Sequence, residues 1–239
     1  MFVLDQFNDK MADYYFFPPS PKMNIEQARF NMIEQQIRTW DVLDQDVLDL
    51  LSVVKREDFV PAAHKNLAFV DTEIPLQFGE AMLTPKLEAR LLQEVGLKKH
   101  ENVLEIGTGS GYMAALLAYK GRHVTTVEVV PQLKELAERT LAANGVSNVT
   151  VELGNGAQGW AKGAPFDVIV ISGSLPVLPE TLLQQVKVGG RIAAIIGQAP
   201  VMSAHLITRV SETAYDTVKL FETNLKPLST ATTPSPFTF

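Results

Sequence analysis

The stretch VLEIGTGSGY at residues 103–112 decides the fold. Its first residues are apolar and typical of a short buried strand, and Tyr112 begins a helical run, so the three alternating glycines lie where a strand turns into a helix. Glycines at such a turn let the backbone approach a ligand closely, and the amides at the start of the helix are free to bind polar or anionic atoms. The stretch therefore predicts a ligand site.

The segments after this stretch alternate between short apolar runs and helices, which is the pattern of a parallel sheet with helical crossovers. We expect parallel strands at 102–106, 123–127, 149–152, 166–171 and 191–196, helices at 112–119 and from Pro131 to Asn144, and antiparallel strands near 204–210 and 214–221. The predicted fold class is α/β, with a doubly wound, mostly parallel sheet and antiparallel C-terminal strands.

Three helices are predicted before the first of these strands. One begins after Asn24, which forms a capping-box pattern with Gln27, and a second follows Asp44. The third has Thr84 as its N-cap, a proline at its first position and a glycine at its end. We interpret the chain as one domain with an N-terminal helical subdomain. Its expected parts are an N-terminal extension at 1–22, a helical part at 23–100, the ligand-binding part at 101–228 and a C-terminal tail at 229–239.

The composition excludes several classes of chemistry. The chain of 239 residues has no cysteine, which excludes disulfides, thiolate metal sites, iron–sulfur clusters and cysteine nucleophiles. Its four histidines lack metal-ligand spacing, so no metal is expected, and a net charge of −6 argues against a nucleic-acid partner. No apolar run reaches the roughly 18 residues of a membrane span and no secretory signal is visible, so we expect a cytoplasmic protein without a membrane partner.

Three nucleotide-type motifs compete for the glycine turn. A P-loop needs Lys followed by Ser or Thr after its second glycine, and the stretch lacks that pair. The dinucleotide fingerprint is weakened because Tyr112 stands where that fingerprint has Gly or Ala. Glu105, Gly107, Gly109 and Gly111 instead form the E-x-G-x-G-x-G pattern that is typical of Rossmann-like S-adenosylmethionine-dependent methyltransferases.

An acidic residue, Glu128, ends the second predicted strand. A carboxylate at this place accepts hydrogen bonds from both hydroxyls of a bound ribose. The ribose of either S-adenosylmethionine or NAD would satisfy Glu128, and the alternative is a solvated carboxylate at the end of a strand.

Several stretches together resemble the protein-L-isoaspartate O-methyltransferase family along nearly everything from Met23 to Leu228. They are KREDFVP at 55–61, AFVDTEIP at 68–75, VLEIGTGSGY at 103–112, GNG at 154–156, APFD at 164–167, VGGR at 188–191 and LKPL at 225–228. The resemblance implies a Rossmann-like methyltransferase sheet and methyl transfer from S-adenosylmethionine to the side-chain carboxylate of an abnormal aspartyl residue in a damaged polypeptide, with S-adenosylhomocysteine as the product. Such a carboxylate is already ionised at neutral pH, so it needs no general base.

The resemblance also implies which residues bind the cofactor. Asn155 replaces an aspartate of the family, and its carbonyl can still accept a hydrogen bond from the adenine amino group. Glu105 either meets the methionine amino group or bonds the amides of the glycine turn as a structural carboxylate, and both interpretations stay open. The full expected set is Glu105, Gly107, Thr108, Gly109, Ser110, Gly111, Glu128, Val129, Asn155 and Gly156.

The loop before the third helix departs from the family. Where the family typically has Gly-Gln-Thr-Ile-Ser, one further residue and Pro, this chain has GEAMLTP at 79–85. The threonine has become Ala81 and the serine has become Leu83, so Thr84 is the nearest hydroxyl. Thr84 is therefore the candidate catalytic residue, with a role as helix cap as the alternative. After the fourth strand, SGS at 172–174 stands where the family usually has Thr-Ala-Ala.

Three functions remain open on the sequence. The first is a carboxyl methyltransferase of the isoaspartyl-repair type, whose acceptor is a peptide or protein carboxylate. The second is a methyltransferase of the same fold with another acceptor, such as a small molecule, which the changes at Ala81 and Leu83 favour. The third is a catalytically degenerate module that binds S-adenosylmethionine and uses its N-terminal extension to engage a partner. The oligomeric state is not determined, and a dimer formed through the extension stays open.

Overall fold

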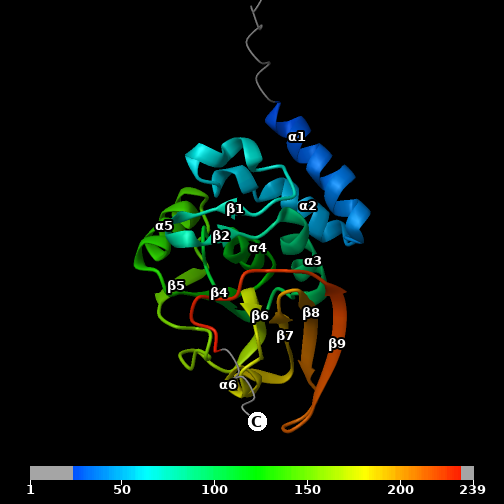
Figure 1. Ribbon diagram of the computed structural model, residues 1–239, viewed down its shortest axis with the longest axis vertical. Coiled ribbons are helices and arrows are strands. Elements are labelled where there is room, and N and C mark those ends of the chain that lie inside the picture. Colours follow the sequence, from blue (N-terminus) through cyan, green and yellow to red (C-terminus); the bar gives the residue numbers. More distant parts are fainter. Residues whose placement is uncertain (1–23, 233–239) are drawn as a thin grey trace, which may run out of the picture.

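The computed structural model describes residues 24–232 (Figure 1). The predicted extension at 1–22 and residues 233–239 of the predicted tail lie outside the described residues. The helices are α1 (Ile25–Asn31), α2 (Gln45–Val53), α3 (Pro85–Val95), α4 (Tyr112–Lys120), α5 (Pro131–Ala143) and α6 (Glu180–Gln184). The strands are β1 (Ile74–Pro75), β2 (Ala81–Met82), β3 (Asn102–Ile106), β4 (His123–Glu128), β5 (Val149–Leu153), β6 (Phe166–Leu175), β7 (Val186–Gln198), β8 (Val201–Arg209) and β9 (Tyr215–Glu222).

Seven strands form one sheet in the order β5-β4-β3-β6-β7-β8-β9. The pairs from β5 to β7 are parallel, whereas β8 and β9 pair antiparallel with their neighbours. The chain first builds outward from β3 to β5 and then crosses back to place β6 on the other side of β3. The strand order therefore reverses at β3, and ligands of open α/β sheets bind at the carboxyl ends of the strands at such a point.

The predicted helix starts are confirmed by their caps. Asn24 accepts a hydrogen bond from the amide of Gln27, Asp44 from those at the start of α2, and Thr84 from Leu87 at 3.3 Å. A left-handed glycine, Gly96, ends α3. These signals act within one turn of helix, so the sequence alone carries them. After α1 the helix continues as a π-helix (Met32–Ile37) and a 3-10 turn (Arg38–Trp40).

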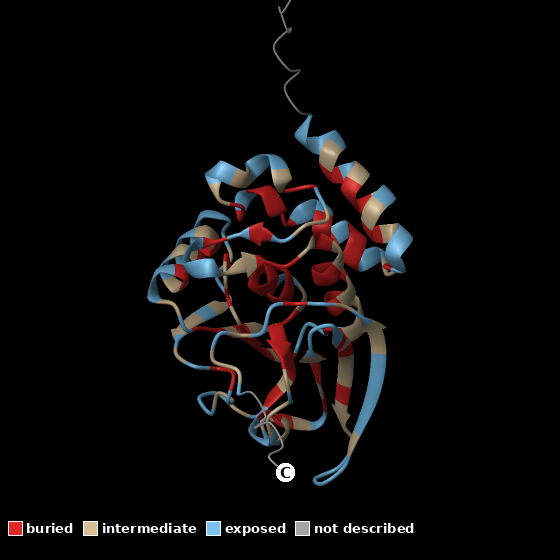
Figure 2. Cartoon of the chain, in the orientation of Figure 1, coloured by how far each residue is buried: buried red, intermediate tan, exposed pale blue. Residues whose placement is uncertain are grey.

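Two apolar layers cover the two faces of the large sheet, because successive residues of a strand point to opposite sides. Val103 packs in the layer beneath α2, α3, α4 and α5, and the next residue, Leu104, packs in the other layer. The first layer includes residues of the N-terminal helical part, so this part and the sheet share one core. The second face is covered by α6 and by irregular segments around Trp160 and Leu228. Buried residues accordingly concentrate in α4 and the central strands (Figure 2).

Some elements differ from the prediction. The short pair β1–β2 and helix α6 were not predicted, because two-residue strands and a five-residue helix carry no periodicity. β6 extends beyond the predicted end at Ile171 through a register shift between Val170 and Ser174. β7 begins at Val186, earlier than predicted, because a pair of glycines interrupts its apolar pattern. No helix within residues 24–232 has the length and apolar character needed to cross a membrane.

Candidate active site

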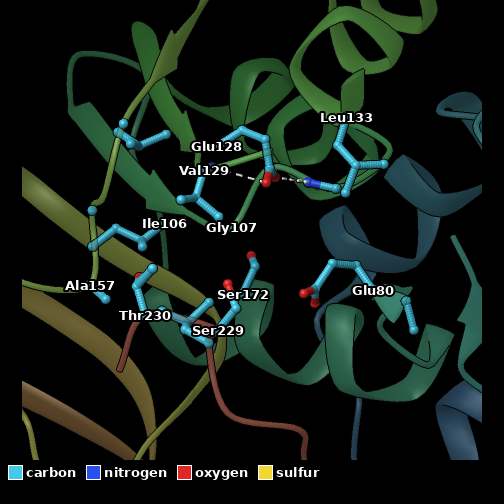
Figure 3. A pocket seen from close by; sticks show the side chains of 16 residues that line it. Glu80, Ile106, Gly107, Glu128, Val129, Leu133, Ala157, Ser172, Ser229 and Thr230 are labelled. Atoms are coloured by element: carbon cyan, nitrogen blue, oxygen red, sulfur yellow. Dashed lines mark hydrogen bonds between the residues drawn. The ribbon is translucent and has the colours of Figure 1, made fainter. Parts of the chain in front are cut away.

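A cavity of about 510 Å³, open to solvent, lies at the carboxyl ends of β3 and β4, where the strand order reverses (Figure 3). The predicted cofactor residues in its wall are Gly107, Gly109, Glu128, Val129 and Gly156. The remaining lining residues are Glu80, Ala81, Ile106, Val127, Leu133, Gly154, Ala157, Ser172, Leu228, Ser229 and Thr230.

The glycine turn has the geometry that only glycine adopts freely. Gly107, Gly109 and Gly111 have φ angles of 94°, 54° and 87°. A Cβ atom at Gly107 would lie 3.2 Å from the carbonyl oxygen of Ser172 on β6, so the turn also packs closely against the neighbouring strand. Gly111 is the N-cap of α4 and faces α5 rather than the cavity. The positive φ angles of the three glycines thus set the shape of the turn.

Glu128 fixes the glycine turn to the end of β4. Its Oε2 accepts a hydrogen bond from the amide of Gly109 at 3.0 Å, and its Oε1 accepts from the amides of Val129 and Val130, each at 3.0 Å. The residue is only 4% exposed, so the alternative of a solvated carboxylate is wrong. Three of its roughly four lone-pair sites are used, and one on Oε2 is left for a ligand hydroxyl.

Glu105 is buried at the end of β3 and takes part in a chain of hydroxyl groups. It accepts hydrogen bonds from Thr126 on β4 at 2.7 Å and from Ser172 on β6 at 2.8 Å, and the Thr126 hydroxyl also contacts that of Thr108 at 2.7 Å. Burial raises the pKa of Glu105 to about 8, although the two hydroxyls partly oppose the shift. The amide of Gly109 bonds Glu128, so the structural role expected of Glu105 falls to Glu128.

Another cavity, of about 280 Å³, lies beside the glycine turn, and we call it the third cavity; the second is described below. It is lined by Glu105, Thr108 and Ser110 together with Gly107 and Gly109. Leu83 and the buried Glu88 of α3 form its opposite wall. Seven of the ten predicted cofactor residues thus lie together, as Glu105, the five residues of the glycine turn and the carboxylate bonded to that turn. They are Glu105, Gly107, Thr108, Gly109, Ser110, Gly111 and Glu128.

Asn155 lies behind the wall of the cavity, whereas the adjacent Gly156 lies in it. The side-chain oxygen of Asn155 accepts hydrogen bonds from the amide of Ala157 at 3.0 Å and from the hydroxyl of Thr230 at 2.6 Å. Both lone pairs of that oxygen are used in this way, so an adenine amino group would have to replace Thr230. A Cβ atom at Gly156 would lie 2.9 Å from Ile106, which explains the glycine there.

The loop that departs from the family forms the wall between the cavities. Leu83 is buried and lines both the third cavity and a second one of about 340 Å³, which lies between β2 and residues 225–228. Thr84 caps α3, and it is absent from the residues that line the three cavities in the described part of the chain. A catalytic role for Thr84 or at position 83 therefore stays a prediction.

The C-terminal segment 225–230, which was not predicted to belong to the site, runs past the end of β6 (Figure 1) and contributes lining residues to the first and second cavities. Ser174 of β6 binds it three times, through its amide to Lys226, its carbonyl to Leu228 and its hydroxyl to Leu225. Gly173 leaves room for it, because a Cβ atom there would lie 2.5 Å from the side chain of Leu228. The LKPL stretch, one of those that resemble the family, was the available signal, but nothing local indicated where it packs.

Comparison with known proteins assigns these features to one family. The family model described as Protein-L-isoaspartate(D-aspartate) O-methyltransferase (PCMT) matches residues 27–229. Protein-L-isoaspartate O-methyltransferase 1 of Rhodopseudomonas palustris (strain HaA2) is 39% identical over 191 residues, which cover 80% of this chain and 77% of that protein. The protein-L-isoaspartate O-methyltransferase of Gloeobacter violaceus is 40% identical over 166 residues, covering 70% of this chain and 81% of that protein.

Solved structures agree on the fold. A crystal structure from Plasmodium falciparum, described as a beta-aspartate methyltransferase (PCMT) in complex with S-adenosyl-L-homocysteine, superposes with a TM-score of 0.74 at 19% identity and covers 87% of this chain and 99% of its own. A protein-L-isoaspartate O-methyltransferase structure gives a TM-score of 0.71 at 25% identity, covering 86% and 66%. The predicted fold class is confirmed. On the family model and the relatives together, this chain belongs to the protein-L-isoaspartate(D-aspartate) O-methyltransferase (PCMT) family.

Proposed function

We propose that this chain transfers the methyl group of S-adenosylmethionine to the free carboxylate of isoaspartyl residues in damaged polypeptides, the reaction that gives its family its name. The observation that carries the proposal is the cavity at the reversal of the strand order, whose wall contains a left-handed glycine turn and the buried Glu128 that is hydrogen-bonded to it. Family membership narrows the ligand of such a cavity from nucleosides in general to S-adenosylmethionine.

The residues present fit this cofactor. Glu128 keeps a free lone pair for a ribose hydroxyl, and the glycines at 107 and 156 let the backbone approach the ligand. Glu105 offers a carboxyl group for the methionine ammonium in the third cavity, which Gly107 and Gly109 also line. S-adenosylmethionine supplies a methyl group that is activated by its sulfonium charge. The structure from Plasmodium falciparum holds S-adenosyl-L-homocysteine, which supports the same class of ligand here.

The chain's own contribution to the reaction is orientation and exclusion of water. An ionised carboxylate attacks without loss of a proton, so no side chain has to act as a general base. Ala81, Met82 and Leu83 give the second cavity an apolar wall. This cavity adjoins the one at the carboxyl ends of β3 and β4, which we propose binds the cofactor and call the cofactor cavity. Correct alignment of two reactants in such a site is worth effective concentrations of about 10⁵ M or more.

Two measurements test the proposal. Calorimetric titration is expected to show binding of S-adenosylmethionine and of S-adenosylhomocysteine. Transfer of a labelled methyl group is then measured onto an isoaspartyl peptide and onto the matched peptide with a normal aspartyl residue. We expect a base-labile methyl ester on the isoaspartyl peptide alone. Tight cofactor binding without any label on that peptide would contradict the proposed acceptor.

A second candidate function has support from residues 79–85, the loop before α3, which we call the acceptor loop. The loss of both hydroxyls at Ala81 and Leu83 removes polar groups that the family presents to its acceptor, which favours another acceptor on the same cofactor chemistry. Label found on small molecules or on normal protein carboxylates, but not on the isoaspartyl peptide, would support this candidate. Cofactor binding with no transfer to any acceptor would indicate a degenerate binding module.

The partner is proposed to be a polypeptide. The net charge of −6 supports a polypeptide over a nucleic acid, since nucleic-acid binders carry a basic surface. The location in the cytoplasm, the lack of a membrane partner and a dimer through the N-terminal extension stay predictions.

A further inference from the structure

Lys226 lines the second cavity, which shares Glu80, Ala81, Ser172 and Leu228 with the cofactor cavity. Its Nζ is 2.9 Å from Oε2 of Glu80 and donates a hydrogen bond to the carbonyl oxygen of Gly79 at 2.8 Å. Glu80 lines both cavities, and its side chain points toward Ser172 across the cofactor cavity (Figure 3). Among the described residues that line the three cavities around the glycine turn, Lys226 is the only cationic one.

The backbone at Lys226 is fixed. The amide of Ser174 donates to the carbonyl oxygen of Lys226 at 3.1 Å, and the amide of Leu228 donates to the carbonyl oxygen of Ser174 at 3.0 Å. The hydroxyl of Ser174 donates to Leu225 at 2.8 Å, so both sides of Lys226 are bound to the end of β6. The backbone of Lys226 is therefore held in place, and only its side chain loses conformational freedom when a ligand binds.

Lys226 also has the free side-chain donor of the second cavity. Of the residues that line this cavity, only Lys226 and Ser172 have side-chain N–H or O–H groups. The hydroxyl of Ser172 already donates to Glu105 at 2.8 Å. An ammonium group has three N–H donors, of which Glu80 and Gly79 take two. One donor is left on a residue that lines the same cavity as Ala81 and Leu83, the two positions where the acceptor loop has lost its hydroxyls.

We propose that Lys226 binds the free carboxylate of the acceptor at the edge of the cofactor cavity. When no acceptor is bound, Glu80 pairs with the ammonium group of Lys226. This inference rests on the proposed function, because it requires a carboxylate as acceptor. The contact with Glu80 shows that the ammonium is placed to pair with a carboxylate. Glu73, in the wall of the same cavity, is exposed, and water screens its charge.

The charge change during the reaction predicts which kinetic constant depends on Lys226. The acceptor carboxylate is anionic before the reaction and becomes a neutral ester as its oxygen forms the bond to the methyl carbon and the bond from that carbon to sulfur breaks. A cation therefore attracts the bound acceptor more strongly than the transition state. An interaction of this kind lowers KM without raising kcat.

The experiment compares Lys226→Met and Lys226→Arg with a matched control, Lys219→Met. Lys219 lies on β9 away from the cavities and pairs with Glu222 at 2.9 Å, and its side chain is 55% exposed against 48% for Lys226. For methylation of the isoaspartyl peptide, we expect Lys226→Met to raise KM by about 5- to 20-fold with kcat unchanged or slightly higher. Lys226→Arg is expected to retain most of the affinity, and Lys219→Met to match the unmodified chain.

A second variant tests the role of Glu80. Glu80→Gln removes the competing charge from Lys226, so KM for the peptide is expected to fall. Binding of the peptide to the protein loaded with S-adenosylhomocysteine is titrated for each variant, together with the thermal midpoint and the affinity for S-adenosylhomocysteine. These last two values are expected to be unchanged in Lys226→Met, which separates loss of acceptor binding from loss of structure.

Different outcomes contradict the two proposals. If the unmodified chain methylates the peptide and Lys226→Met has the same KM, or loses kcat alone, the inference about Lys226 is wrong and the proposed function stands. If the unmodified chain binds S-adenosylmethionine but neither methylates nor binds the isoaspartyl peptide, the proposed function is wrong before any variant is made, and the inference falls with it.

Discussion

The carboxylate of Glu128 accepts a hydrogen bond from the backbone amide of Gly109, with 3.0 Å between Oε2 and the nitrogen. This bond joins the end of β4 to the glycine turn that follows β3, so one buried side chain both shapes the turn and lines the cavity. Its other oxygen accepts from two further amides, those of Val129 and Val130. Loss of this carboxylate therefore leaves buried donors without a partner and removes a carboxyl group from the wall of the proposed cofactor cavity.

Glu128→Ala is expected to weaken the binding of S-adenosylmethionine by about 1–3 kcal/mol, the cost of losing charged hydrogen bonds in a buried place. Calorimetric titration measures this change. The control is Glu152→Ala on the neighbouring strand β5, where the carboxylate pairs with Lys162 outside the cavity. Equal affinities of the Glu128 variant and the unmodified chain would remove Glu128 from the cofactor site.

Leu83→Ser is expected to raise the rate of isoaspartyl methylation by about 3- to 10-fold, because a hydroxyl returns to the wall between the second and third cavities and can bond the acceptor. Leu83→Ala is the matched control, since it opens the same space without a hydroxyl. Both variants lose a buried side chain and are expected to be destabilised by about 2–4 kcal/mol in urea unfolding. Equal rates for the two variants would show that the hydroxyl has no role.

The raised pKa of Glu105 makes stability depend on pH. The native carboxyl has a pKa of about 8 against an ordinary value of 4.5, so between these values the native state holds a proton that the unfolded state has lost. The free energy of unfolding therefore falls as the pH rises from about 4.5 to 8, with a slope of at most about 1.4 kcal/mol per pH unit from this group. Glu88, whose pKa burial raises to about 7, adds a fall of the same sign.

Glu105→Gln is expected to reduce this loss of stability on the alkaline side. Urea unfolding at pH 6, 7 and 8 measures it, with the unmodified chain as reference. A pH dependence of the variant equal to that of the unmodified chain would show that Glu105 is already ionised in the native state at pH 6.

Arg56 holds the acceptor loop in place from beneath. Its Nε lies 3.1 Å from Glu88, and its other nitrogens donate to the carbonyl oxygens of Leu83 at 2.6 Å and Ala68 at 3.1 Å. Arg56→Met leaves Glu88 without its partner in a buried place, which is expected to lower the free energy of unfolding by about 3–5 kcal/mol.

The control for Arg56 is Arg38→Met, which breaks the more exposed pair of Arg38 with Glu34 and is expected to cost about 0–1 kcal/mol. Both values come from denaturant unfolding. If Arg56→Met lowers the free energy of unfolding as little as Arg38→Met does, the attraction between Arg56 and Glu88 only offsets the cost of burying their charges.

Much of the fold could be predicted because its signals are local. The bounds of β3 and the start of α3 at Pro85 follow from apolar runs and caps that depend on residues within one turn or one strand. Glu105 and Glu128 could be placed at one edge of the sheet, since parallel strands end side by side. The hydrogen-bond roles of these two carboxylates could not be assigned, because they depend on which hydroxyl or amide of a neighbouring segment comes within reach.

The sequence by itself determined the glycine turn, the order of α1–α5 and β3–β9 along the chain, the cap of α3 and the lack of thiol chemistry. Only the tertiary structure decided that Lys226 meets Glu80 and that Thr230 meets Asn155, because these partners are far apart in the chain. Helical periodicity and capping act over a few residues, whereas the place of the C-terminal segment depends on its packing against β6 and on the space that Gly173 leaves for Leu228. The glycine turn is thus set by local sequence, whereas the partners of Glu80, Glu128 and Asn155 are set by tertiary packing.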